Sequence, residues 1–190
     1  MESSYLIRRG QADDAAALYS LIKEMSEYEK LSAGSLQMTI DGVREHILSA
    51  DSPATCLVIE DENSSKDVAD LAGFAVYNTI VQAYTGKSTY LNSLFVAAKH
   101  RRKGLASALL NTVAKDSRKS GCSAMTWRVY AWDSETIRVY EKLGAHNVTK
   151  DEELEIFALD NEKLQALAER ELKSREDVKI DIQTHQDPDS

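Results

Sequence analysis

The sequence contains few cysteines and prolines and no long apolar run, and each shortage excludes a class of protein. Its two cysteines, Cys56 and Cys122, lie far apart and without histidines or cysteines at ligand spacing, so they predict reduced core thiols and no metal site. No stretch approaches the length of a membrane span, and residues 1–4 do not begin a basic region followed by an apolar one. We therefore expect a soluble, cytoplasmic protein with no membrane partner.

Basic charge is scarce as well. The 190 residues include 23 Lys and Arg against 31 Asp and Glu, which gives a formal net charge of -8. This balance argues against nucleic acid as a partner and favours cationic ligands. The basic cluster at residues 99–103 therefore needs a local explanation.

One domain is expected. Hydrophobic residues make up 43% of the chain, which is enough for one full core at this length. We expect that domain to cover residues 1–173. The tail, residues 174–190, is polar and charged and has too few apolar residues to offset the entropy of ordering, so it is predicted to be disordered.

Hydrophobic periodicity predicts alternating strands and helices. Apolar and β-branched runs predict strands at residues 5–8, 54–59, 68–80, 90–96, 123–130 and 154–158. Helical spacing and capping residues predict helices from Asp13 or Asp14, over 39–48, from Leu105 to Gly121, from Asp133 to Leu143, and over 161–173. The third strand is nearly all small or apolar, which indicates that both of its faces are covered.

We expect the chain to be organised around residues 89–110, which read TYLNSLFVAAKHRRKGLASALL. A strand gives way to a helix here, and cations surround the junction. Because the N–H groups of a helix N-terminus are unpaired, the junction predicts a pyrophosphate site. The glycines do not match a dinucleotide fingerprint, and Lys103 precedes Gly104, unlike a Walker A loop. A merely solvated cationic turn is the alternative.

The pattern Arg101-x-x-Gly104-x-Ala106 resembles the acetyl-CoA loop of the GCN5-related N-acetyltransferases, the GNAT superfamily. A second junction, residues 133–145, resembles that family's other fingerprint, in which a Tyr and a Gly follow a capped helix start. The order and separation of the two motifs also match. The resemblance implies an α/β fold with a mixed central sheet, splayed middle strands and flanking helices.

Within the superfamily the chain is most similar to the diamine and thialysine acetyltransferases, through residues 21–24, 28–29, 90–91, 94–96 and 122–125. This implies that an acetyl group moves from acetyl-CoA to a primary amine of a small diamine, polyamine or lysine analogue such as thialysine. The resemblance also implies direct transfer in a ternary complex and a homodimer. The chain departs from the subfamily at Asn92, where a Glu is usual.

The resemblance further implies roles for individual residues. Tyr140 would be the catalytic acid for the leaving thiolate. Cofactor-binding residues would be Leu94, Phe95, Val96, Arg101, Arg102, Lys103, Gly104, Leu105, Ala106, Ser107, Asp133, Ser134, Glu135, Thr136, Tyr140 and Leu143. Substrate-binding residues would be Tyr28, Glu29, Asn92, Thr126, Trp127, Arg128 and Glu152.

Two other functions stay open at this point: acetylation of a peptide or protein amine, and a non-catalytic acetyl-CoA-binding module. Glu152 and Glu153 also fit a role as plain surface charges. Asn92 cannot accept a proton near neutral pH, so we expect an acceptor amine with a lowered pKa or one positive charge. Thialysine-like amino acids and short diamines meet this condition better than spermine.

Overall fold

A computed structural model describes residues 4–32, 34–63 and 71–169 of the chain. The chain divides into two compact units, Met1–Arg138 and Val139–Ser190. The predicted tail at 174–190 lies outside the described residues, as do residues 68–70 of the third predicted strand, and the domain extent of 1–173 stays a prediction. In the described part of the chain, no helix is long and apolar enough to cross a membrane.

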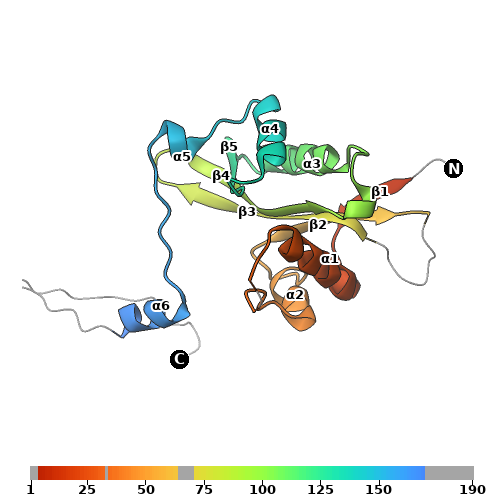
Figure 1. Ribbon diagram of the computed structural model, residues 1–190, viewed down its shortest axis with the longest axis horizontal. Helices are drawn as coiled ribbons and strands as arrows, with labels where there is room; N and C mark the ends of the chain where they lie inside the picture. Colours follow the sequence, from red (N-terminus) through yellow and green to blue (C-terminus); the bar gives the residue numbers. More distant parts are fainter. Residues whose placement is uncertain (1–3, 33, 64–70, 170–190) are drawn as a thin grey trace, which may run out of the picture. The chain divides into compact units, whose positions relative to one another are not determined.

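The first unit is built on a five-stranded mixed sheet with the strand order β1-β2-β3-β4-β5 (Figure 1). The strands are β1 (Tyr5–Arg9), β2 (Thr55–Asp61), β3 (Leu71–Gln82), β4 (Gly86–Val96) and β5 (Ala124–Trp127). Neighbouring strands from β1 to β4 are antiparallel, whereas β4 and β5 are parallel. The connection from β4 to β5 must therefore cross over the sheet, and α3 (Leu105–Lys119) lies in it.

Helices cover both faces of this sheet, as Figure 1 shows. On one face lie α1 (Ala15–Tyr28) and α2 (Ile40–His46), and their apolar sides share a core with Phe74, Val76 and Phe95. On the opposite face lies α3, where the Thr89 hydroxyl donates to the Ser117 hydroxyl at 2.7 Å. Every residue of the segment 71–77 in β3 is buried, so the predicted two-sided cover is confirmed. The predicted mixed sheet flanked by helices is confirmed as well.

Strand β4 is irregular at one residue. Leu91 pairs with Tyr77 and Ser93 pairs with Val76, so Asn92 is an extra residue in a β-bulge. The parallel pairing with β5 ends at Leu91 and Trp127, although β4 continues to Val96. The predicted strand at 123–130 is therefore too long, because the pairing of β5 with β4 stops next to the bulge.

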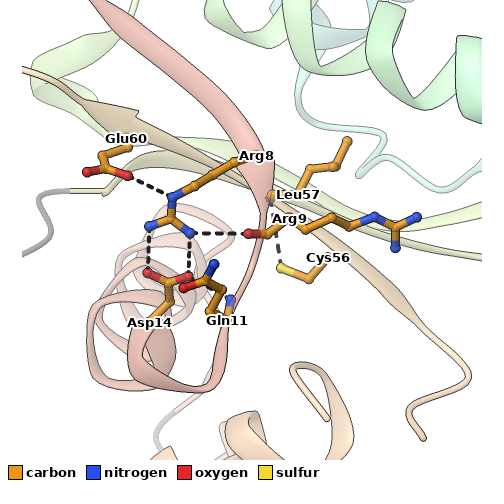
Figure 2. A network of polar contacts seen from close by, with 7 residues as sticks. All are labelled: Arg8, Arg9, Gln11, Asp14, Cys56, Leu57 and Glu60. Atoms are coloured by element: carbon orange, nitrogen blue, oxygen red, sulfur yellow. Dashed lines mark hydrogen bonds and ion pairs between the residues drawn. The ribbon is translucent and has the colours of Figure 1, made fainter. Parts of the chain in front are cut away.

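A polar network joins the start of the chain to the sheet, as Figure 2 shows. The Arg8 guanidinium donates to both carboxylate oxygens of Asp14, at 2.7 and 2.9 Å, and its Nε donates to Glu60 at 2.7 Å. Asp14 also accepts from the N–H of Gln11, the N-cap of the short helix η1 (Ala12–Asp14). Asp14 occupies the predicted capping position of α1 but makes no side-chain cap bond there, since its carboxylate serves Arg8 instead.

Helix α4 (Ser134–Lys142) begins in the first unit and ends in the second, which also contains α5 (Val148–Asp151) and α6 (Asn161–Ala168). The predicted strand at 154–158 is wrong: these residues form no strand, and Ile156 and Phe157 are 68% and 88% exposed. A strand needs the backbone of a neighbour, and β-propensity alone does not supply one. The predicted helix at 161–173 is observed as α6, and residues 170–173 lie outside the description.

Candidate active site

The predicted phosphate loop connects β4 to α3 through the short helix η2 (Ala98–His100). Gly104 is the N-cap of α3 with a φ of 78°, and Arg102 is left-handed too, with a φ of 62°. The first turn of α3 has no side-chain cap and no acidic residue. A Cβ built on Gly104 would meet nothing within 4 Å, so the approach to these N–H groups is open. The loop therefore fits a pyrophosphate group, as in acetyl-CoA.

The structure gives the three predicted loop cations different surroundings. The Arg101 Nε donates to the Val96 carbonyl at 3.0 Å, and its guanidinium lies 4.6 Å from the centre of the Tyr28 ring. The Lys103 ammonium donates to the Tyr5 hydroxyl at 2.6 Å. Arg102 is exposed, and no hydrogen bond or ion pair engages its side chain in the described residues. Arg101 and Lys103 thus help to hold the loop, while Arg102 faces solvent.

The predicted cosubstrate strand, Leu94 to Val96, ends β4 next to β3. The Phe95 side chain is buried in the α1 core, so only backbone groups of Phe95 could meet a ligand. Beyond Leu91 no β5 residue pairs with β4, and backbone groups that point to that side have no strand partner in the described sheet. These groups can receive a linear, amide-containing chain such as pantetheine.

Two residues that the sequence interpretation missed position this strand end. A Cβ on Gly73 would lie 2.6 Å from the Phe95 carbonyl oxygen, so only glycine lets β3 approach β4 this closely. Glu24 on α1 accepts the N–H of Ala98 at 2.8 Å, directly after the strand. Gly73 could have been suspected as a glycine inside a strand. Glu24 belongs to the segment 21–24 that carries the family resemblance, but no local pattern indicated its contact with Ala98.

An aromatic cluster lies around the start of α4. Tyr28 and Tyr130 both pack against the Trp132 ring, with centroids 5.9 and 5.8 Å away. The Lys30 ammonium lies 4.3 Å from the centre of the Trp132 ring. Tyr28 also packs against Phe95 at 6.3 Å, so this cluster links the end of α1, the end of β4 and the segment before α4. Trp132 therefore packs against its aromatic neighbours, although 44% of it is exposed.

Asp133 is the polar centre of this region. One carboxylate oxygen caps α4 by accepting the N–H of Thr136 at 3.1 Å, which confirms the predicted cap. The other accepts the Tyr28 hydroxyl at 2.8 Å. Burial opposes ionisation, but the hydrogen bonds from Thr136 and Tyr28 outweigh it and lower the pKa of Asp133. Burial, and then the bond to Asp133, raises the pKa of Tyr28, so the pair is an ionised carboxylate and a neutral phenol at pH 7.

The predicted substrate residues of the sheet lie on two faces. Tyr90 pairs with Thr126 and Leu91 with Trp127, and side chains alternate along a strand, so Trp127 shares the α3 face with Leu91. The other face carries Asn78, Tyr90, Asn92, Thr126 and Arg128, which we call the acceptor face. On it the Asn92 amide nitrogen donates to the Asn78 amide oxygen at 2.7 Å. Asn78 was not predicted.

Glu29 follows Tyr28 at the end of α1. Its side chain is partly buried, and that burial raises the pKa of its carboxyl group. A carboxyl group with a raised pKa accepts a proton more readily than an ordinary surface acid. Glu29 is therefore a chemically suitable residue for handling the proton of an amine.

Three predicted site residues belong to the second unit. Tyr140 is half-buried on α4, and its carbonyl accepts the N–H groups of Leu143 and Ala145 at 3.0 and 3.1 Å as the helix ends. Leu143 is 60% exposed, and Glu152 is exposed where α5 ends. The other α4 residues predicted to bind cofactor, Ser134, Glu135 and Thr136, lie in its first turn in the first unit.

Both cysteines and the potential metal ligands can be located in the described part of the chain. Both cysteines are free and buried, as predicted, and burial raises the pKa of the Cys56 thiol to about 12. In the residues that the structure describes, no group of three or more potential ligands could hold a metal ion.

Comparison with known proteins agrees with this geometry. A model of the acetyltransferase (GNAT) family matches residues 16–145. The chain is 27% identical to the thialysine N-epsilon-acetyltransferase of Sus scrofa over 168 residues, and this alignment covers 87% of this chain and 98% of that protein. It is 26% identical to the spermidine/spermine N(1)-acetyltransferase-like protein 1 of Homo sapiens, over 86% of this chain and 24% of that protein. An aminoglycoside N-acetyltransferase solved with CoA matches at a TM-score of 0.64 and 19% identity, over 85% of this chain and 97% of that one.

Proposed function

The chain belongs to the acetyltransferase (GNAT) family and is an acetyl-CoA-dependent amine N-acetyltransferase, and we propose that its acceptor is a small diamine, polyamine or lysine analogue such as thialysine. This membership, together with relatives named as N-acetyltransferases, supports an enzyme over a non-catalytic binding module. The names of the relatives support the choice of acceptor, since they act on thialysine or belong with spermidine and spermine acetyltransferases.

The observation that carries the cosubstrate half of the proposal is the open start of α3. Acetyl-CoA, when bound, supplies an acetyl group activated as a thioester. The N–H groups from Leu105 to Ser107, with Gly104 at the cap, would hold its pyrophosphate because no side-chain cap engages them in the described part of the chain. Arg102 would add an exposed positive charge nearby.

The reaction itself needs two further groups. Backbone N–H groups from Leu94 to Val96 would donate to the carbonyl oxygen as negative charge develops on it. Tyr140 would give its phenolic proton to the departing sulfur. Direct transfer in a ternary complex requires no residue that carries the acetyl group. The thiol of Cys56 in β2 would be a poor carrier, because it is buried and un-ionised at pH 7.

The acceptor amine must be neutral when it attacks. An alkyl amine has a pKa near 10.4, so it must lose a proton on or after binding. Asn92 cannot take that proton, whereas the carboxyl group of Glu29 has a raised pKa and could take it through water. With an amide in place of an acid on the acceptor face, each extra ammonium of a polyamine lacks a counter-charge there. We therefore propose that thialysine and short diamines are better acceptors than spermine.

Release of free thiol from acetyl-CoA tests the proposal directly. The panel would contain thialysine, a short diamine, spermine and a peptide with a free N-terminus, each assayed at several acetyl-CoA concentrations. We expect intersecting initial-rate patterns and the highest kcat/KM for thialysine or the short diamine. A clear preference for spermine would show that Asn92 does not disfavour polyamines. A preference for the peptide would show that the acceptor is a peptide amine and not a small amine.

We also propose that the enzyme is a cytoplasmic homodimer. Free buried thiols support a reducing compartment, and a twofold dimer is the commonest assembly of a soluble chain. Light scattering at micromolar concentration should give twice the chain mass. A species of 21.1 kDa would be the monomer and would count against the dimer.

A further inference from the structure

The strongest unexplained feature of the acceptor face is its single formal charge. Arg128 follows β5 directly, one residue past the last pair of β4 and β5, and its side chain is exposed. Its guanidinium carbon lies 5.9 Å from the centre of the Tyr90 ring. This contact places the guanidinium over the face that also carries Asn92.

No acidic group of the first unit balances this charge. Among the described residues of that unit, the guanidinium of Arg128 forms no ion pair with a carboxylate. The other members of the acceptor face are Asn78, Tyr90, Asn92 and Thr126, none of which is an acidic or basic residue. A face meant only for ammonium groups would repel its ligand here. A guanidinium instead presents paired N–H donors that match a carboxylate.

Asn92 complements Arg128. The hydrogen bond to Asn78 occupies the amide nitrogen of Asn92, which leaves the amide oxygen as an acceptor on the same face. An amide oxygen accepts from an ammonium group without requiring a second charge. The face therefore offers a cationic donor and a neutral acceptor, which are the two partners that a zwitterionic head group needs.

We propose that Arg128 is a specificity-determining residue that binds the carboxylate of an α-amino acid acceptor, with Asn92 accepting from its α-ammonium group. This inference rests on the proposed function, and it narrows the acceptor to amino acids that carry a second, reactive amine. A diamine lacks the carboxylate and meets only the repulsion of the guanidinium. The enzyme would thus select against polyamines by charge as well as by the missing acid at position 92.

A matched pair of acceptors isolates the carboxylate. Bis(2-aminoethyl) sulfide is thialysine without its carboxylate, so the two molecules share the reacting amine and the thioether chain. For the wild-type enzyme we expect kcat/KM to be at least ~10-fold higher for thialysine. The methyl ester of thialysine, which has no anionic charge, should behave like the sulfide diamine.

Arg128→Gln then assigns the effect to the residue. We expect it to lower kcat/KM for thialysine by about 10- to 100-fold, mainly through KM, because a charge-assisted hydrogen bond is lost. The value for bis(2-aminoethyl) sulfide should stay the same or rise. Arg128→Lys keeps the charge without the paired donors, so its kcat/KM for thialysine should lie between those of the wild type and Arg128→Gln. Arg44→Gln on α2 makes the same charge change at a residue that pairs with Asp41 and does not belong to the acceptor face, so it should leave both acceptors unaffected.

The outcomes separate this inference from the proposed function. If both acceptors are used equally well and Arg128→Gln leaves their ratio unchanged, the carboxylate role is wrong while the acetyltransferase proposal stands. If no small amine is acetylated, both fail. A higher kcat/KM for a lysine-terminated peptide with a free carboxylate than for thialysine would overturn the amino-acid assignment. Circular dichroism of each variant verifies that it is folded.

Discussion

The hydroxyl of Tyr28 donates a hydrogen bond of 2.8 Å to the carboxylate of Asp133, a residue 105 positions later in the chain. Tyr28 ends α1, and Asp133 caps α4, the helix that carries Tyr140. One bond therefore ties the helix next to the predicted substrate residue Glu29 to the start of the helix that bears the proposed acid. Removal of the hydrogen bond between Tyr28 and Asp133 should affect both stability and catalysis.

Tyr28→Phe tests this link, because it keeps the ring that packs against Phe95 and Trp132. Loss of the donor leaves an oxygen of the buried Asp133 without its partner, and we expect the free energy of unfolding to fall by about 1–2 kcal/mol. The lowered pKa of Asp133 should rise towards its ordinary value. Urea unfolding and initial rates measure the two effects, and kcat/KM should drop as the start of α4 loosens.

Tyr84→Phe is the matched control for that substitution. Tyr84 is fully exposed in the turn between β3 and β4, so removal of its hydroxyl should change neither stability nor rate. Equal effects of the two variants would mean that the bond between Tyr28 and Asp133 has no special role.

Gly104→Ala tests the phosphate loop. The Cβ has open space, so the substitution acts through the left-handed φ of 78°, which costs about 1–2 kcal/mol for a residue other than glycine. We expect the loop to shift and the affinity for acetyl-CoA, measured by calorimetry, to fall at least ~10-fold.

Gly121→Ala provides a closely matched comparison. Gly121 has the same φ of 78° and the same open surroundings, but it lies just beyond the C-terminal end of α3. The Gly121→Ala variant should lose about as much stability as Gly104→Ala and keep normal affinity for acetyl-CoA. Normal affinity in Gly104→Ala, or equal losses in both variants, would contradict a special role for the loop.

Tyr140→Phe removes the proposed acid and little else. We expect kcat to fall by about 10² to 10⁴, the range typical of a general acid, while the dissociation constant of acetyl-CoA stays nearly constant. Near-normal turnover would make Tyr140 a structural residue of α4.

Asp14→Asn should destabilise the protein in a pH-dependent manner. Burial alone would raise the pKa of Asp14, but the hydrogen bonds from Arg8 and the Gln11 N–H dominate and lower it from 3.8. A carboxyl group with a lower pKa in the folded state stabilises it above pH ~4, and this contribution is lost as the pH falls through the folded-state pKa. We expect the variant to lose about 3 kcal/mol at pH 7, because a buried partner of Arg8 is removed.

The difference from the wild type should therefore shrink below pH 4, as urea unfolding at several pH values would show. Asp41→Asn is the control, because its ion pair with Arg44 joins two exposed side chains and contributes about 0–1 kcal/mol. A loss in Asp14→Asn that is independent of pH would show that packing, and not charge, is responsible.

Local signals in the sequence were sufficient for most elements and for the cosubstrate loop. Gly104 and the cations before it stand between an apolar run and a helical repeat, and Asp133 precedes another helical repeat, so short-range chemistry specifies both junctions. The motifs around them were sufficient to indicate the family and its cosubstrate. These features depend on residues within one or two turns of each other, which is why a linear reading finds them.

Tertiary structure decided what depends on distant partners. The hydrogen bond of Tyr28 to Asp133, the contact of Glu24 with Ala98 and the close approach of Gly73 to Phe95 each join segments that no local pattern connects. The same limit explains the predicted strand at 154–158, since its β-branched and aromatic residues indicate a strand only where a neighbouring backbone is present to pair with it. The register of β4 and β5 also brought Arg128 onto the face of Asn92, and pairing of this kind is settled by backbone hydrogen bonds across the sheet and not by the residues of either strand alone.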